Sequence, residues 1–158
     1  MNSKMARFVL TALSVLSLCL NGFAGGQTAA ALSQEDGAAF TGKQATALLT
    51  QVRQGVEGHM QKQMLDAFDL SRMSAGQAFK DQITAFFDRY DSVRIHFHVR
   101  EVAMEGDKGV ALVDVEMELE QRGSTGPAVR KQAQLRFVAE SVGRVWKFTD
   151  IQPRTFFS

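Results

Sequence analysis

Two of the chain's three histidines stand two residues apart, in the segment VRIHFHVRE that runs over residues 93–101. Imidazole nitrogens bind zinc and transfer protons near neutral pH, so a pair at this spacing is a candidate for a metal site or for acid–base chemistry. Glu116 and Glu118 could supply the carboxylates that complete such a site. His96 and His98 are therefore either half of a site or part of the solvated face of a strand.

The segment around the histidines has the period of a β-strand, in which successive side chains point to opposite faces. Its apolar face carries Ile95, Phe97 and Val99, and its polar face carries Arg94, His96, His98 and Arg100. The next strand along the chain has acids in the same alternation: Asp114, Glu116, Glu118 and Glu120. These faces predict a half-buried sheet with charged side chains on its outer surface.

A turn at residues 106–108 would set the histidines directly opposite this acidic row. His98 would lie beside Glu116 and His96 beside Glu118, with Arg100 beside Asp114. The following strand would place Arg130 near Glu120 and Arg136 near Asp114. Cross-strand pairs of opposite charge contribute about 0.2–1 kcal/mol each. This ladder explains both histidines without chemistry, so His96 and His98 stay a minority candidate for a metal site, and no metal is predicted.

The first residues have the order of a secretory signal peptide. Lys4 and Arg7 precede an apolar run over residues 8–20, and small residues at Gly22 and Ala24 follow it. The run is short for a membrane-spanning helix, which needs about 20 residues. We predict a signal peptide over residues 1–24 and a flexible lead-in over 25–39, with an uncleaved N-terminal anchor as the alternative. The protein is then exported, periplasmic or secreted, and not membrane-bound after cleavage.

The composition limits the class of the remaining chain. The only cysteine, Cys19, lies inside the apolar run, so the mature domain would have neither a disulfide nor a thiolate site. Hydrophobic residues make up 45% of the 158 residues and the formal net charge is +1, with basic residues scattered along the chain. These values indicate one globular domain and no electrostatic surface for nucleic acid. No residue pattern indicates a cofactor.

Residues 40–158 are predicted to form three helices followed by four strands. The clearest helix carries apolar residues at helical spacing: Phe79, Ile83, Phe86, Phe87 and Tyr90. Capping-box spacing begins one helix at Thr41 and another at Ser74, while Gly55 and Gly58 predict a bend or break. Short turns between strands predict an antiparallel meander. The fold class is therefore α+β, with the helices packed on one face of a curved four-stranded sheet.

This element order, the segment AFFDRYDSVRIHFHV and the closing VWKFTDIQP resemble the nuclear transport factor 2-like superfamily, which includes SnoaL-like and ketosteroid-isomerase-like domains. The resemblance implies a cystatin-like cone with an apolar cavity, in an exported bacterial member. Enzymes of the family place a tyrosine and acids in that cavity, whereas other members bind small molecules or proteins, often as dimers through the sheet. This chain departs from the enzymes, because its one tyrosine, Tyr90, ends a helix.

The sequence favours a non-catalytic domain that binds a small apolar ligand or a protein partner, with a homodimer as a further expectation. The predicted cavity residues are Leu48, Val52, Phe68, Phe86, Phe87, Met117, Phe137 and Trp146. The alternative is a small lyase or isomerase that uses Asp66, Asp69 or Asp150 as a base. Asp150 would share the inner face with Trp146 and Phe148 if the last strand keeps its alternation.

Overall fold

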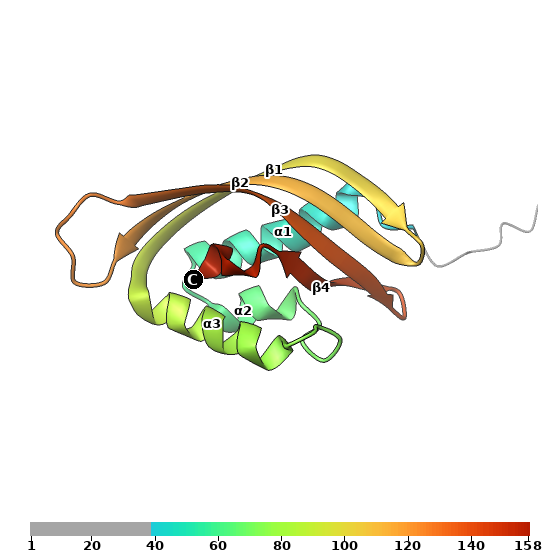
Figure 1. Cartoon of the computed structure of the whole chain (residues 1–158), viewed down its shortest axis with the longest axis horizontal. Coiled ribbons are helices and arrows are strands. Elements are labelled where there is room, and N and C mark those ends of the chain that lie inside the picture. Colours follow the sequence, from blue (N-terminus) through green and yellow to red (C-terminus); the bar gives the residue numbers. More distant parts are fainter. Residues whose placement is uncertain (1–38) are drawn as a thin grey trace, which may run out of the picture. The chain divides into compact units, whose positions relative to one another are not determined.

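The computed structural model describes residues 39–158, where three helices precede a four-stranded antiparallel sheet (Figure 1). The elements are α1 (Gly42–Glu57), α2 (Gln61–Asp66), α3 (Gly76–Arg89), β1 (Tyr90–Glu105), β2 (Lys108–Gln121), β3 (Val129–Val142), β4 (Val145–Gln152) and the 3-10 helix η1 (Arg154–Phe157). The strand order β1-β2-β3-β4 is that of a meander. The predicted α+β class is therefore confirmed.

Two sequence predictions concern the chain before this domain. The predicted signal peptide lies outside the described residues, and so does the predicted lead-in except for Ala39. Within residues 39–158, none of the helices is long and apolar enough to cross a membrane.

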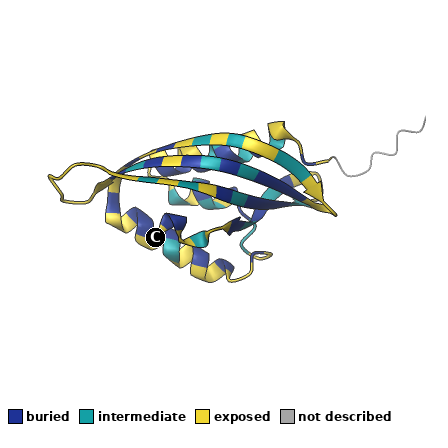
Figure 2. Cartoon of the chain, turned by 45° about the horizontal axis from the view of Figure 1, so that its top comes forward, coloured by how far each residue is buried: buried dark blue, intermediate teal, exposed yellow. Residues whose placement is uncertain are grey.

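The inner face of the sheet packs on the helices and forms one apolar core. The sheet arches over α1, α2 and α3 (Figure 1), and buried residues alternate with exposed ones along its strands (Figure 2). Aromatic rings link the layers: Phe68 of the segment after α2 lies 5.0 Å from Phe79 of α3 and 5.6 Å from Phe148 of β4, measured between ring centroids. Burying each such side chain contributes about 1.5–3 kcal/mol.

The helix ends confirm one predicted cap and correct another. Thr41 and the side chain of Gln44 form the predicted capping box at the start of α1. The capping box at Ser74 is wrong, because α3 begins two residues later, after Ala75 in the left-handed region with φ 60° and without a side-chain cap. The break predicted near Gly55 and Gly58 is confirmed: α1 continues through Gly55 to Glu57, and Gly58 ends the helix.

A short C-terminal element was not predicted. After β4 the chain turns into η1, whose Phe156 and Phe157 are buried. Phe157 lies 5.6 Å from Phe86 and edge-on to it, so the last turn closes the core beside α3. Aromatic pairs of this geometry contribute about 0.5–1.5 kcal/mol beyond their buried area.

Candidate functional site

The predicted cavity residues lie in the core of the domain. Seven of the eight are buried, and the eighth, Leu48, packs against them partly exposed. Phe137 shows how closely this region is filled, because its ring lies 4.7 Å from that of Phe148 and 6.3 Å from that of Phe97. The predicted residues are thus neighbours in one cluster, as the fold requires, and their role as a cavity wall stays a prediction.

Two of the three candidate bases lie at the periphery, near α2. Asp66 ends α2 and forms an ion pair with Lys62, 2.9 Å away, with about half of its side chain exposed. Asp69 accepts hydrogen bonds from the hydroxyl and the backbone N–H of Ser71. The hydrogen bond from the Ser71 hydroxyl is the main reason that the pKa of Asp69 is lowered. Both groups therefore help to order the segment around α2.

The third candidate, Asp150, lies on the outer face of the sheet. A bulge at Thr149 breaks the alternation of β4, so Phe148 pairs with Ala139 but Asp150 pairs with Val138. The prediction that Asp150 faces inward with Phe148 is therefore wrong. Its carboxylate accepts hydrogen bonds from the Arg154 guanidinium at 2.7 and 3.0 Å. Burial raises the pKa of Asp150, but hydrogen bonds from Arg154 and Gln152 outweigh it, and the net shift is downward.

The charged ladder around the histidines exists, but in a different register. His96 lies opposite Glu116 and His98 opposite Asp114, so each histidine faces the acid two residues before the predicted one. The cause is a two-residue turn between Glu105 and Lys108 together with a register shift after Val99. From this irregular position Arg100 still reaches Asp114, at 3.6 Å.

The acids of β2 are bound mainly by β3. Gln132 donates to Glu116 at 3.0 Å, Arg130 pairs with Glu118 at 2.7 Å, and Gln134 donates to Asp114 at 3.2 Å. The predicted pairing of Arg130 with Glu120 is therefore wrong, because this hairpin is also shifted by two residues.

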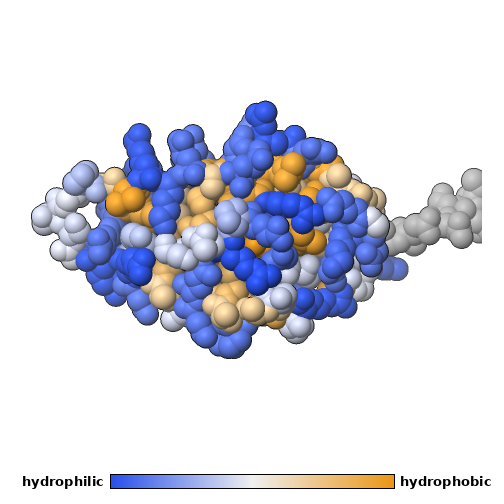
Figure 3. Space-filling model, viewed as in Figure 1, coloured by the Kyte–Doolittle hydropathy of each residue, from blue (hydrophilic) through white to orange (hydrophobic). Residues whose placement is uncertain are grey.

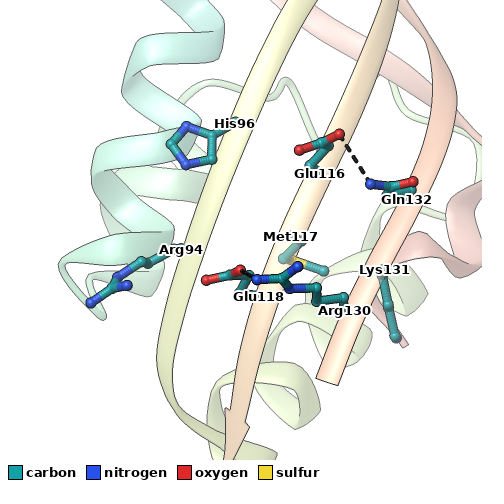
Figure 4. Close-up of a pocket in the computed structure, with 8 residues that line it drawn as sticks. All are labelled: Arg94, His96, Glu116, Met117, Glu118, Arg130, Lys131 and Gln132. Carbon is teal, nitrogen blue, oxygen red and sulfur yellow. Dashed lines mark hydrogen bonds and ion pairs between the residues drawn. The ribbon is translucent and has the colours of Figure 1, made fainter. Parts of the chain in front are cut away.

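Figure 4 shows the consequence for β1. The Arg94 and His96 side chains lie on the side of β1 away from Glu116 and Glu118. All four residues line one surface depression of about 310 Å³, together with residues of β3. Neither the Arg94 nor the His96 side chain has a hydrogen bond or ion pair to any residue within 39–158. In the same part of the chain, no group of three or more His, Cys, Asp or Glu side chains is placed to hold a metal ion.

A second group of polar side chains, not predicted from the sequence, surrounds Glu140 on the outer face. Its carboxylate lies 2.8 Å from the Lys108 ammonium and 3.4 Å from the Arg72 guanidinium, and it accepts a hydrogen bond from the Thr149 hydroxyl at 3.3 Å. We call these four residues the Glu140 cluster. Hydrogen bonding by Lys108 is the main reason that the pKa of Glu140 is lowered, and Glu140 in turn raises the pKa of Lys108.

The Glu140 cluster borders a depression of about 270 Å³ with an apolar floor. Val110 and Val138 pair across β2 and β3 and form this floor. Both are buried, yet they stand outside the core cluster because they point to the outer face. An apolar floor with a charged rim can hold a small amphiphilic molecule or the side chain of a partner protein.

The bulge that builds this site left a signal in the sequence. Trp146 and Phe148 are two residues apart, but the next apolar residue, Ile151, follows three residues later. That change of spacing marks an extra residue, and an extra residue in a strand is a β-bulge. Arg72 and Lys108 gave no such signal, because they reach Glu140 only through the tertiary fold.

If the ion pairs of Glu140 stabilise the fold, replacing Glu140 should lower the stability by an amount that depends on pH. Because the pKa of Glu140 is lower in the folded than in the unfolded chain, its contribution is present above the unfolded pKa and is lost as the pH falls through the folded pKa. Glu140→Gln should lower the free energy of unfolding by about 1 kcal/mol at pH 7. Urea unfolding at pH 7 and pH 3 measures this.

The matched control is Glu101→Gln, in an exposed glutamate of β1 whose side chain has no hydrogen bond or ion pair to residues 39–158. We expect this variant to unfold like the parent at both pH values. An equal loss for Glu140→Gln at both pH values would contradict the assignment, since a protonated carboxyl can no longer form the ion pairs.

Comparisons with known proteins identify the fold. No protein-family model matches the sequence, and no curated protein matches it. Among solved structures, a proposed aromatic ring hydroxylase from Novosphingobium aromaticivorans matches with a TM-score of 0.58 and 17% identity, over 69% of this chain and 84% of that chain. A type 2 hexachlorocyclohexane dehydrochlorinase matches with a TM-score of 0.57 and 13% identity, over 69% and 80% of the two chains.

A third structure is the beta subunit of benzoate 1,2-dioxygenase from Burkholderia mallei. It matches with a TM-score of 0.52 and 10% identity, over 72% of this chain and 89% of that chain. Identities this low show a common fold and carry no activity from one chain to another. The described domain therefore shares its fold with these structures, which agrees with the fold that the resemblance noted in the sequence implied.

Proposed function

We propose that this protein is an exported, non-catalytic binding domain that contacts a small ligand or a partner protein through the outer face of its sheet. The observation that carries the proposal is the contrast between the two faces. The inner face is filled by packed aromatic rings, whereas the outer face carries the Glu140 cluster beside an apolar floor. Figure 3 shows, on one side of the domain, hydrophobic areas between hydrophilic side chains.

The chemistry of the depression indicates the kind of ligand. Lys108 and Arg72 stand beside Glu140, and Glu105 pairs with Arg136 on the same rim. Both signs of charge therefore surround the two valines. A small molecule with an apolar body and both a cationic and an anionic end would fit this arrangement, as would the corresponding side chains of a partner protein or of a second copy.

The similar structures support two different readings. The benzoate 1,2-dioxygenase beta subunit is by name part of a larger assembly, which favours a role in binding. The dehydrochlorinase is by name an enzyme, and it keeps the lyase or isomerase alternative open. In that alternative a carboxylate would face the interior, but Asp66 and Asp69 are held near α2 and Asp150 lies outside.

A titration followed by two-dimensional NMR tests the proposal. We expect 6-aminohexanoate, which has an apolar chain and both charges, to shift the amide signals of Val110, Val138 and Glu140 saturably. Glu140→Gln should abolish the shifts, because it removes the anionic partner of the cationic end. Hexane-1,6-diol, which lacks both charges, is the control ligand. If export and cleavage occur as proposed, the intact mass of the secreted protein should correspond to a chain whose first residue is near Gly25.

Two results would contradict this proposal. One is a saturable shift confined to interior residues such as Val52 and Phe137, which would indicate a cavity ligand. The other is protein-catalysed exchange of the α-protons of small ketones in D₂O, lost in Asp69→Asn or Asp150→Asn. The second result would establish the proton-transfer alternative.

A further inference from the structure

The two edges of the sheet differ in how far other parts of the domain cover them. Along β4, the segment after α2 covers the edge: the Asp69 N–H donates to the Phe148 carbonyl at 2.8 Å, and the Phe148 N–H donates to the Ala67 carbonyl at 3.0 Å. The opposite edge belongs to β1, the first strand in the order. There, the Ile95 N–H donates to the Glu57 carboxylate of α1 at 3.1 Å.

The bond from Ile95 shows which backbone groups of β1 point to the free edge. In an antiparallel pair, residues alternate between bonding to the partner strand and pointing away from it. Because the Ile95 N–H points away from β2, those of Phe97 and Val99 do so as well. Neither donates to a side chain or to backbone outside the sheet within residues 39–158. Among the described residues, the edge is thus open at Phe97 and Val99.

A groove runs beside this open edge. Phe97 and Val99 line it from β1, and Thr46, Leu49, Thr50 and Arg53 line it from α1, around a volume of about 120 Å³. Phe97 and Val99 are only half-buried, although Ile95 in the same phase is fully buried. An apolar side chain from an added strand would complete their burial, which is favourable by about 25 cal/mol for each Å² of apolar surface.

The charged side chains on the outer face of β1 indicate which residues an added strand would carry on its own outer face. Over residues 94–98 the outward side chains of β1 are arginine and histidine, and β2 presents acids to them on one side only. Those acids are engaged by β3, while Arg94 and His96 lean toward the free edge (Figure 4). The Arg53 side chain, in the groove wall, also has no hydrogen bond or ion pair within 39–158. A second copy of β1 paired over the same residues, 94–98, would oppose like charges, which is destabilising.

We propose that the open edge of β1, at Phe97 and Val99, binds an extended segment of a partner protein by strand addition. The segment alternates apolar residues, which face the groove, with acidic residues, which face the row of Arg94, His96 and His98. Backbone hydrogen bonds supply affinity, and the alternate side chains supply specificity. This inference names the partner class for the proposed binding function and therefore rests on it.

The test uses a peptide that already has this pattern. Blocked, fluorescein-labelled VDVEMELE, the sequence of residues 113–120, is titrated with the full protein, and its fluorescence anisotropy is recorded at low and at physiological salt. We expect saturable binding that shifts the amide signals of Phe97 and Val99 and weakens as salt rises. The same peptide with lysine at each acidic position, and one with N-methyl groups on alternate amides, should bind at least about tenfold more weakly.

Protein variants locate the site. The double variant Arg53→Glu, Arg94→Glu should bind the acidic peptide about tenfold or more weakly than the parent does. It should bind the lysine peptide more tightly, since the charges are then reversed. Arg144→Glu, at an exposed position between β3 and β4, is the matched control and should bind like the parent. The replaced arginines are exposed, so unfolding midpoints should change little and a loss of binding cannot be ascribed to unfolding.

The inference is overturned if the acidic peptide fails to bind at millimolar concentration, if its N-methylated form binds equally well, or if the double variant leaves its affinity unchanged. If the acidic peptide fails to bind but 6-aminohexanoate still shifts the amide signals of Val138 and Glu140, strand addition alone is wrong. Failure of both ligands would remove the proposed binding function as well.

Discussion

In the Phe137→Ala variant, the free energy of unfolding should fall by about 3–5 kcal/mol, because the substitution leaves a cavity at a fully buried position. Phe137 is the position that best distinguishes core from cavity wall. Its ring packs against Phe148 at 4.7 Å and against Phe97 at 6.3 Å, so little of it is free to meet a ligand. Denaturant unfolding at pH 7, with a constant m-value, measures the loss.

The control is Val129→Ala in the same strand, where the side chain is 48% exposed and the loss should stay below about 0.5 kcal/mol. Should Phe137→Ala fail to fold, Phe137→Leu provides a milder step of about 1.5 kcal/mol or less. A loss below about 1 kcal/mol in Phe137→Ala would contradict a solid core. It would instead support the sequence prediction that Phe137 lines an open cavity.

Replacing Gly55 by alanine should destabilise the protein by about 1–3 kcal/mol, through overpacking where α1 meets α2. An added Cβ at Gly55 would lie 2.7 Å from the Cα of Met64 and closer still to its backbone nitrogen. These are backbone atoms, so only a shift of α2 can relieve the contact. Alanine favours the helix over glycine by about 1 kcal/mol, and the expected net loss shows that the contact outweighs propensity.

Gly42→Ala is the matched control, since Gly42 begins the same helix and a Cβ there meets nothing within 4 Å. We expect this variant to be unchanged or more stable by up to about 1 kcal/mol. Thermal and urea unfolding of both variants provide the comparison. If the two alanine variants change the free energy of unfolding equally, α2 can move away from Gly55 without a loss of stability.

Gly55 also explains which features of the helices could be predicted. The spacing of Phe79, Ile83 and Phe86 predicts both α3 and its buried face, because helical period and burial follow from the same positions. Low helix propensity at Gly55 and Gly58 predicted a break near these residues, and α1 does end at Gly58. The sequence did not predict why Gly55 itself is glycine, which is the close approach of the Met64 backbone. Such a contact between helices is absent from any local pattern.

On the outer face of the sheet, too, some features follow from local sequence patterns and others arise only from the tertiary fold. Alternation along β1 and β2 predicts that His96 pairs across the strands with an acid of β2, and this holds although the register moved by two residues. The site around Glu140 could not be predicted, because Arg72, Lys108 and Thr149 come from three separate elements. The bulge at Thr149 brings the last of them into place.

The cover over the edge at Phe148 has a consequence for assembly. A filament built by edge pairing needs every copy to offer one free edge to the copy before it and another to the copy after it. Where Ala67 and Asp69 hydrogen-bond to Phe148, the sheet is closed to such a neighbour. Strand addition at β1 therefore ends after a single step, and the protein can accept a partner's strand without becoming the seed of a fibre.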